Sequence, residues 1–303
     1  MELRDKKILL TGARGFVGRA VCARLQSIGV PEKNIALHSS EKGDLRTKEA
    51  AREAVRGAHI IIHLAGITGG ILFHRDNANR IYEDNFLMGM NMLGAARESG
   101  AEKFVMAGSL TEYGMDAALP LSEDSLWSGD PKPQHAAYAR AKREILLEAK
   151  KQRAQGLESA HLLLASMYGP GERDDFVIPK LIKKIAAAKR EDKPQLLEQG
   201  GASTRDFLFV EDAARAILAA AESYDSDTPL NIASGIEVSI RDLALLIGKI
   251  IGYEGVMQFE SVAERPDRVV ADIRRAKKEL GWTPLVDLET GLRATIAWHE
   301  RHV

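Results

Sequence analysis

A tyrosine and a lysine four positions apart, Tyr138 and Lys142, have residue types and a spacing that could do chemistry. On a helix this spacing places both side chains on one face, one turn apart. An ammonium group beside a phenol favours the phenolate, so Tyr138 could exchange a proton with a carbonyl or hydroxyl group as a hydride moves. The spacing is common by itself. It becomes specific together with Ser109, at the end of a predicted strand, and with a glycine-rich loop near the N-terminus.

That loop has the spacing GxxGxxG and follows the apolar run at residues 7–10 directly. A helical pattern starts within it. Glycines at such a turn let the backbone approach a pyrophosphate, and the N-terminus of the following helix attracts the negative charge. The loop therefore predicts a dinucleotide-binding site. The loop residues that we expect to bind the dinucleotide are Gly12, Arg14, Gly15, Phe16, Val17 and Gly18.

The end of the second predicted strand indicates which dinucleotide binds. A site specific for NAD usually has an acidic residue there, but this strand ends in Leu37, His38, Ser39 and Ser40. Arg14, with His38 and Ser39 beside it, could accept a 2′-phosphate, because a guanidinium matches phosphate geometry. We therefore expect NADP. NAD remains the alternative, in which Arg14 is solvated and Glu41 serves as the missing acid.

Apolar runs alternate with helical patterns up to residue 165 and less regularly after Gly169. Continuous apolar strands are typical of a parallel sheet with helices on both faces. The sequence thus predicts an α/β protein: a doubly wound parallel sheet of the Rossmann type and a smaller mixed C-terminal substrate-binding domain. The expected strands are 7–10, 35–37, 60–63, 104–106, 161–165 and 230–232, and the expected helices are 16–28, 48–56, 81–99, 136–155, 177–188, 210–223, 240–251 and 288–302.

The composition of the 303 residues narrows the class of protein. Lys and Arg total 42 against 43 for Asp and Glu, so the formal net charge of −1 argues against nucleic acid or an anionic membrane as a partner. The eight histidines show no metal-ligand spacing, and no metal is expected. The single cysteine and the charged first residues favour a reducing cytoplasm rather than export or a membrane.

Taken together, these motifs resemble the extended short-chain dehydrogenase/reductase family of NAD(P)-dependent nucleotide-sugar epimerases, dehydratases and reductases. Within it, the chain is most similar to the GDP-L-fucose synthases and related 4-keto-6-deoxy-sugar reductases. The motifs are TGARGFVG at 11–18, Asp44-Leu45, HLAG at 63–66, Asn85, GSLTEYG at 108–114, YARAK at 138–142, YGPG at 168–171, RDFLFVED at 205–212, NIASG at 231–235 and LGWTP at 280–284.

The resemblance implies a role for each matching residue. Tyr138 would be the acid/base, Ser109 and Thr111 would hydrogen-bond the sugar, and Lys142 would bind the nicotinamide ribose. The other implied cofactor contacts are Asp44, Leu45, Leu64, Ala65, Gly66, Ala107, Gly108, Leu164, Ala165, Ser166 and Met167. Lys184, Arg205 and Arg265 would bind the nucleotide diphosphate of the substrate.

The resemblance also implies how the chain is organised. Residues 1–168, joined by 206–235, would form the NAD(P)-binding Rossmann domain, and residues 169–205 and 236–303 the nucleotide-sugar-binding domain. The helices around 80–99 and 136–155 would pair across a two-fold axis, which makes a homodimer the expected assembly.

Three departures from the family pattern narrow the reaction. Thr111 and Phe176 stand where fucose synthases use a cysteine and a histidine to epimerise C3 and C5, and neither can exchange a proton with carbon. Glu112 is one position late for a dehydratase, and one residue along a strand end should reverse the side-chain direction. We expect an NADPH-dependent reductase of a nucleotide-linked 4-keto-6-deoxy sugar. The alternatives are an NAD-dependent 4-epimerase and a non-catalytic dinucleotide-binding scaffold or redox sensor.

Overall fold

The computed structural model describes residues 2–260 and 267–302. Its largest sheet has the strand order β2-β1-β3-β4-β5-β9, and every neighbouring pair is parallel. The sheet confirms the predicted α/β class and its parallel Rossmann-type core. The strands are β1 Ile8–Thr11, β2 Ile35–His38, β3 Ile60–His63, β4 Lys103–Ser109, β5 Glu158–Leu164 and β9 Leu230–Ile232.

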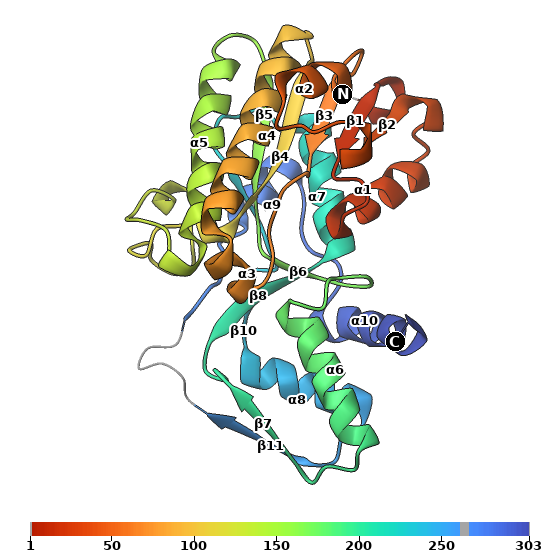
Figure 1. The fold of residues 1–303 in the computed structure, drawn as a ribbon, viewed down its shortest axis with the longest axis vertical. Coiled ribbons are helices and arrows are strands. Elements are labelled where there is room, and N and C mark those ends of the chain that lie inside the picture. The colour runs from red at the N-terminus through yellow and green to blue at the C-terminus, as the bar shows by residue number, and fades with distance from the viewer. Residues whose placement is uncertain (1, 261–266, 303) are drawn as a thin grey trace.

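Helices cover both faces of this sheet (Figure 1). On one face α4 packs against α5 and α2, and on the other α1 packs against α7. Every residue of β1 and β3 is buried as a result, which explains why the first three residues of each strand are apolar. The helices are α1 Phe16–Ser27, α2 Lys48–Ala54, α4 Ala78–Glu98, α5 Ala136–Arg153, α7 Val210–Ser223 and α9 Arg274–Leu280.

A second, smaller group of elements lies beyond the carboxyl ends of these strands (Figure 1). Its hydrophobic cluster includes Ile182, Ile185, Leu243, Ile247 and Leu292 and is separate from the cluster around the large sheet. One sheet there has the order β10-β8-β6, and β11 pairs with β7 in another. These elements are α6 Val177–Arg190, α8 Ile240–Ile251, α10 Leu288–His302, β6 Ser166–Tyr168, β7 Gln195–Gln199, β8 Thr204–Phe209, β10 Glu237–Ser239 and β11 Val256–Glu260.

The loop between β6 and α6 crosses from the smaller group to the larger sheet. Arg173 donates a hydrogen bond to the carbonyl of Thr68 at 2.8 Å, and Asp175 accepts one from the backbone N–H of Gly70 at 2.8 Å. Gly70 is the N-cap of the short helix α3, Ile71–Asp76. These contacts hold the loop across the edge of the sheet at which its strands end.

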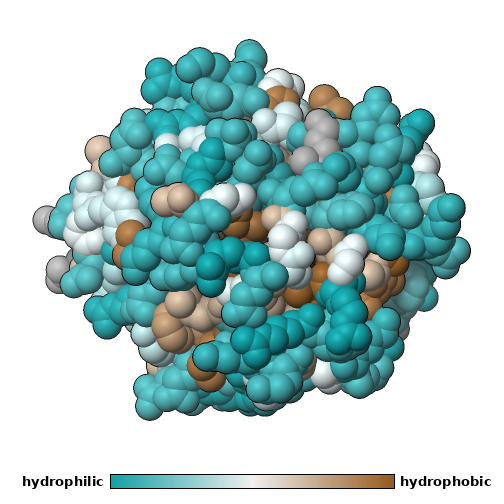
Figure 2. Space-filling model, turned by 90° about the horizontal axis from the view of Figure 1, so that it is seen from above, coloured by the Kyte–Doolittle hydropathy of each residue, from teal (hydrophilic) through white to brown (hydrophobic). Residues whose placement is uncertain are grey.

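The surface seen from above in Figure 2 is mostly hydrophilic, with hydrophobic residues scattered singly or in small groups. Within the described part of the chain, no helix is both long and apolar enough to cross a membrane.

Candidate active site

The glycine loop joins β1 to α1 and has the geometry of a phosphate cradle. Gly12 has φ +68°, and a Cβ on it would lie 2.7 Å from the backbone N of Ala65. A Cβ on Gly18 would lie 2.1 Å from the carbonyl oxygen of Gly12. The helix α1 can therefore lie this close to the loop only because residue 18 is a glycine. Gly15 is the N-cap of α1, and a Cβ added to it would have only the Gly12 oxygen within 4 Å. The free side of the cradle thus fits the pyrophosphate of a dinucleotide.

The segment after β3 is fixed against this loop. The hydroxyl of Thr11 lies 2.8 Å from Nδ1 of His63 and accepts a hydrogen bond from the backbone of Ala65. The Asn85 side chain accepts from the N–H of Ile67 and donates to its carbonyl. Leu64, Ala65 and Gly66, three predicted cofactor contacts, are thereby held beside Gly12.

At the far end of the cradle, Arg14 forms an ion pair with Glu41 at 2.7 Å, and both side chains are about 70% exposed (71% and 69%). The hydrogen bond raises the pKa of Arg14 and lowers that of Glu41. His38 is buried, and burial together with the nearby Lys42 lowers its pKa, so it is neutral at neutral pH. Ser39 follows it at the start of a short 3-10 turn.

Asp44 and Leu45 lie next along the chain. The Asp44 carboxylate accepts hydrogen bonds from Arg46, which also donates to Asp84 at 2.9 Å, whereas Leu45 is buried. These contacts tie the loop after β2 to α4.

The end of β4 continues into a 3-10 turn at residues 110–112. Ser109 caps this turn, and the Thr111 hydroxyl donates a hydrogen bond to the Ser109 hydroxyl at 3.0 Å. The carboxylate of Glu112 accepts a hydrogen bond from the backbone N–H of Ser109 at 2.7 Å. Thr111 and Ser109 are thus brought together, as their predicted shared contact with the sugar requires.

Tyr138 and Lys142 lie in the first two turns of α5, and the Lys142 ammonium is 5.5 Å from the centre of the Tyr138 ring. Burial raises the pKa of Tyr138, and the charge of Glu112 raises it further. Burial lowers the pKa of Lys142 to about 8, against the opposing effect of Glu112. The 3-10 turn that Ser109 caps packs on α5, and Glu112 of this turn is close enough to act on the pKa of both residues. A lysine that is charged at neutral pH and a protonated tyrosine are suited to proton donation.

The remaining predicted cofactor contacts lie at two neighbouring strand ends. Ala107 and Gly108 of β4 pair with Leu162 and Leu163 of β5, and Ser109 pairs with Leu164. The N–H of Ala165 donates to the carbonyl of Ile232 in β9. Ser166 and Met167 then start β6, which runs toward the smaller group of elements.

The three cations predicted for the substrate have different surroundings. Arg205 forms an ion pair with Asp267 at 2.8 Å, and Lys132 pairs with the same carboxylate. Lys184 pairs instead with Glu198 of β7 at 2.7 Å. Arg265 lies outside the described residues. The prediction did not include Lys132 or Asp267, because their approach depends on the packing of distant loops.

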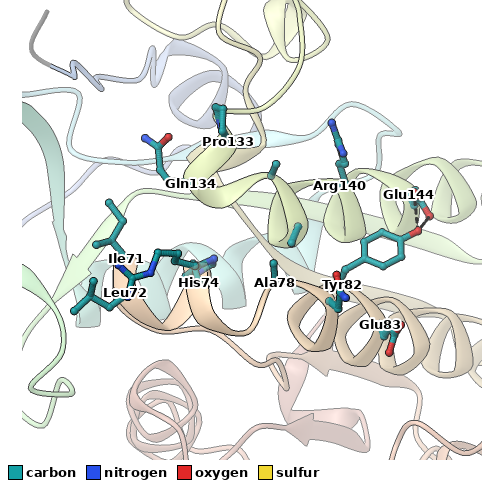
Figure 3. A pocket seen from close by; sticks show the side chains of 14 residues that line it. Ile71, Leu72, His74, Ala78, Tyr82, Glu83, Pro133, Gln134, Arg140 and Glu144 are labelled. Atoms are coloured by element: carbon teal, nitrogen blue, oxygen red, sulfur yellow. Dashed lines mark hydrogen bonds between the residues drawn. The ribbon is translucent and has the colours of Figure 1, made fainter. Parts of the chain in front are cut away.

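A cavity of about 910 Å³ opens between α3, α4 and the start of α5 (Figure 3). Tyr82 and Glu144 are hydrogen-bonded in its wall, and the ring of His74 stands edge-on to that of Tyr138, with centres 5.8 Å apart. Ser109, Thr111 and Lys142 do not line it. The cavity therefore lies on the outer side of the catalytic helix, separate from the predicted sugar site.

One sequence-based argument is wrong in its premise. The direction of Glu112 was inferred from strand alternation, but β4 ends at Ser109 and Glu112 belongs to the 3-10 turn. Its side chain turns back into the interior and meets His161 of β5 at 2.8 Å. No signal within either local segment indicates this contact, because it depends on β4 and β5 being neighbours.

In residues 2–260 and 267–302, no group of His, Cys, Asp and Glu side chains could hold a metal ion.

Comparison with known proteins identifies the family of the chain. The model of the NAD dependent epimerase/dehydratase family matches residues 8–233. A putative GDP-L-fucose synthase 2 of Oryza sativa subsp. japonica is 31% identical over 99% of this chain and 88% of its own length. The match extends over both groups of elements.

Two solved structures share the fold. RMD from Pseudomonas aeruginosa, complexed with NADPH, has a TM-score of 0.86 and 27% identity, with 98% of this chain and 100% of that chain covered. MlghC, a GDP-mannoheptose C4 reductase from Campylobacter jejuni with NADP bound, has a TM-score of 0.89 and 23% identity, with 99% of each chain covered. With the glycine cradle and the Tyr138–Lys142 pair in place, the chain belongs to the NAD-dependent epimerase/dehydratase family.

Proposed function

We propose that this protein is an NADPH-dependent reductase of a nucleotide-linked 4-keto-6-deoxy sugar, with GDP as the nucleotide. The observation that carries the proposal is that Tyr138 and Lys142 lie together on α5, against the 3-10 turn that Ser109 caps. The names of the relatives support the same reading: a GDP-L-fucose synthase in rice and a GDP-linked C4 reductase in Campylobacter jejuni. They favour the reductase over a 4-epimerase or a scaffold.

NADPH is supported by the cradle and by its neighbourhood. Gly12, Gly15 and Gly18 fit the pyrophosphate, and Arg14 is exposed where a 2′-phosphate would lie. RMD, at 27% identity, is complexed with NADPH. When bound, NADPH supplies the hydride for C4 of the sugar.

The chain's own residues do the rest of the chemistry. Ser109 hydrogen-bonds the C4 carbonyl oxygen, and Tyr138 donates its phenolic proton to that oxygen as the alcohol forms. The charge of Lys142 stabilises the phenolate that remains, which solvent then reprotonates. Arg205, Lys132 and Lys184 supply the positive charge for the diphosphate, after exchanging their carboxylate partners for it.

Epimerisation of C3 and C5 is not part of the proposal. The Thr111 hydroxyl donates to Ser109, and Phe176 caps α6 beside Arg173. Neither side chain offers a group that trades a proton with carbon at neutral pH. Reduction at C4 needs neither.

The test is turnover of a GDP-linked 4-keto-6-deoxy sugar with NADPH, run in deuterium oxide. We expect NADPH to be consumed and no deuterium to appear at C3 or C5 of the product. Tyr138→Phe should lower kcat at least about a thousandfold while NADPH still binds. The matched control is Tyr82→Phe, which removes a hydroxyl bonded to Glu144 in the outer cavity. Unchanged turnover in Tyr138→Phe would contradict the mechanism, and deuterium at C5 would contradict simple reduction.

A homodimer is the proposed assembly. Leu87 of α4 and Leu147 of α5 are 42% and 45% exposed, and their helices pack side by side on one face of the sheet. A second copy would cover these side chains with the same two helices, as in the related family members. Sedimentation of the purified protein tests this, and Leu147→Glu should shift it toward the monomer.

A further inference from the structure

Glu112 and His161 form a buried pair behind the predicted active site. The Glu112 side chain is 0% exposed and that of His161 is 1% exposed. Nε2 of His161 lies 2.8 Å from one carboxylate oxygen and 3.1 Å from the other. A buried carboxylate is costly unless it is hydrogen-bonded and balanced by positive charge. We therefore ask which contacts of Glu112 and His161 offset the cost of burying them.

The pair fixes the position of Ser109. One Glu112 oxygen accepts the N–H of Ser109 at 2.7 Å, so the carboxylate holds the backbone of that residue directly. A Cβ on Gly108 would lie 2.2 Å from Nε2 of His161 and 2.5 Å from the same Glu112 oxygen. The two side chains thus meet across Gly108, and only glycine leaves room for them there.

The pair also acts on the catalytic helix. Arg143 of α5 donates to the carbonyl of Glu112 at 2.7 Å, which ties the 3-10 turn to the helix that carries Tyr138 and Lys142. The carboxylate charge raises the pKa of both residues, against burial for Lys142 and with burial for Tyr138. The titratable and charged groups that face Glu112 are Tyr138, Lys142 and Arg143 of α5, His161 of β5 and Tyr113 at the end of the turn.

We propose that the Glu112–His161 pair is a positioning element that holds Ser109 in place and sets a negative charge beside Lys142 and Tyr138. The proposal rests on the proposed function, because a protonated tyrosine is the form that donates to a ketone oxygen. His161 anchors the carboxylate through a hydrogen bond at Nε2, and the negative charge favours the protonated tyrosine and the charged lysine. The carboxylate thereby extends the reductase to higher pH.

The first experiment needs no substrate. Protein labelled with ¹³C-lysine is titrated by NMR, and the Lys142 resonance is assigned from its loss in Lys142→Arg. In Glu112→Gln, which keeps an oxygen for the Ser109 N–H, we expect the Lys142 midpoint to fall by about one pH unit. Glu144→Gln is the matched control. Glu144 lies on α5, as Lys142 does, but its carboxylate accepts a hydrogen bond from Tyr82. An unchanged Lys142 midpoint in Glu112→Gln would overturn the proposal.

The second experiment is the pH profile of kcat with the keto sugar and NADPH. The alkaline limb should move about one unit toward lower pH in Glu112→Gln, with KM within about twofold of the wild type. His161→Leu should shift the limb in the same direction, because the carboxylate then loses the hydrogen bond that holds it in place. His161→Gln retains a donor and should restore the wild-type limb.

The double variant Glu112→Gln/His161→Leu should shift no further than Glu112→Gln alone, since both changes act through the same carboxylate. An equal loss of kcat at every pH would show packing alone and overturn the proposal. If the wild type turns over no keto sugar, the proposed function fails, and the lysine titration still decides the role of Glu112.

Discussion

Arg14 and Glu41 decide how the site meets the adenosine end of its cofactor. Both are highly exposed, and each is the other's ion-pair partner. A 2′-phosphate would compete with the Glu41 carboxylate for the same guanidinium and would be repelled by it. The glutamate that could have served as the acid of an NAD site therefore acts, in this arrangement, against the NADPH preference proposed for Arg14.

The prediction is that Glu41→Gln tightens NADPH about threefold and leaves NADH nearly unchanged, because exposed charges interact weakly in water. Arg14→Ala should weaken NADPH at least about tenfold more than NADH, since it removes a charge-assisted contact to the phosphate. Fluorescence titration with both dinucleotides at low and physiological salt measures the two ratios. Equal losses for NADPH and NADH in Arg14→Ala would remove the 2′-phosphate role from Arg14.

Among single residues, the sequence predicts a role only for those that belong to a motif within one short segment. The glycine loop and the Tyr138–Lys142 spacing are readable because their members lie within one turn or one loop. The pairs of Glu112 with His161 and of Arg205 with Asp267 join residues far apart in the chain. No local pattern contains them, and they follow only from strand order and loop packing. The individual roles of the site residues stay predictions.

Among the elements, α1 and the loop before it depend on glycine for a geometric reason. The Gly12 carbonyl lies where a Cβ on Gly18 would be, so any larger residue must push the loop away from the helix. The same contact brings the N-terminus of α1 close enough to the loop to form the cradle.

We predict that Gly18→Ala raises the NADPH dissociation constant at least about tenfold and costs about 1–3 kcal/mol of stability, as overpacking does. The matched control is Gly94→Ala in α4, where a Cβ would meet nothing within 4 Å. That change should stabilise the protein by up to about 1 kcal/mol through helix propensity. NADPH titration and urea unfolding measure both effects. Wild-type NADPH affinity in Gly18→Ala would show that the loop tolerates the displacement.

The predicted elements agree with the structure best where the sequence pattern is long or strongly apolar. The strands 60–63 and 230–232 and the helices 210–223, 240–251 and 288–302 have the predicted bounds. The apolar run at 104–106 covers only part of β4, which continues to Ser109 at the predicted strand end, because pairing with Leu162–Leu164 of β5 extends it through small residues. The elements that were not predicted are α3, α9, β6, β7, β8, β10 and β11. They are short, and β7 and β11 exist only through their mutual pairing.

In the whole molecule, the two groups of elements meet at the carboxyl ends of the large sheet, which is where open parallel sheets place their ligands. The loop with Arg173 and Asp175 bridges them at Thr68 and Gly70. Several histidines near this junction are shielded from water, which disfavours their charged form. Burial lowers the pKa of His135 to about 4 and that of His63 to about 3, with Lys142 adding to the effect at His63.

His63 gives the fold a predictable weakness in acid. Its pKa in the folded protein is about 3, against an ordinary value of 6.5, so between these values the unfolded chain binds a proton that the folded chain does not. Stability is therefore complete above about pH 6.5 and declines as the pH falls toward 3. From pH 7 to pH 5 the contribution of His63 should lower the free energy of unfolding by about 2 kcal/mol.

Urea unfolding at pH 7 and pH 5, followed by circular dichroism, measures this loss. His63→Asn should be less stable than the wild type at pH 7, because it loses the contact with Thr11. Since asparagine cannot take up the proton, the variant's free energy of unfolding should fall by about 2 kcal/mol less than that of the wild type on acidification. His302→Asn, at the exposed end of α10, is the matched control. Identical pH dependence in His63→Asn and the wild type would mean that the acid sensitivity arises elsewhere, with His74 and His135 beside Tyr138 the next pair to replace.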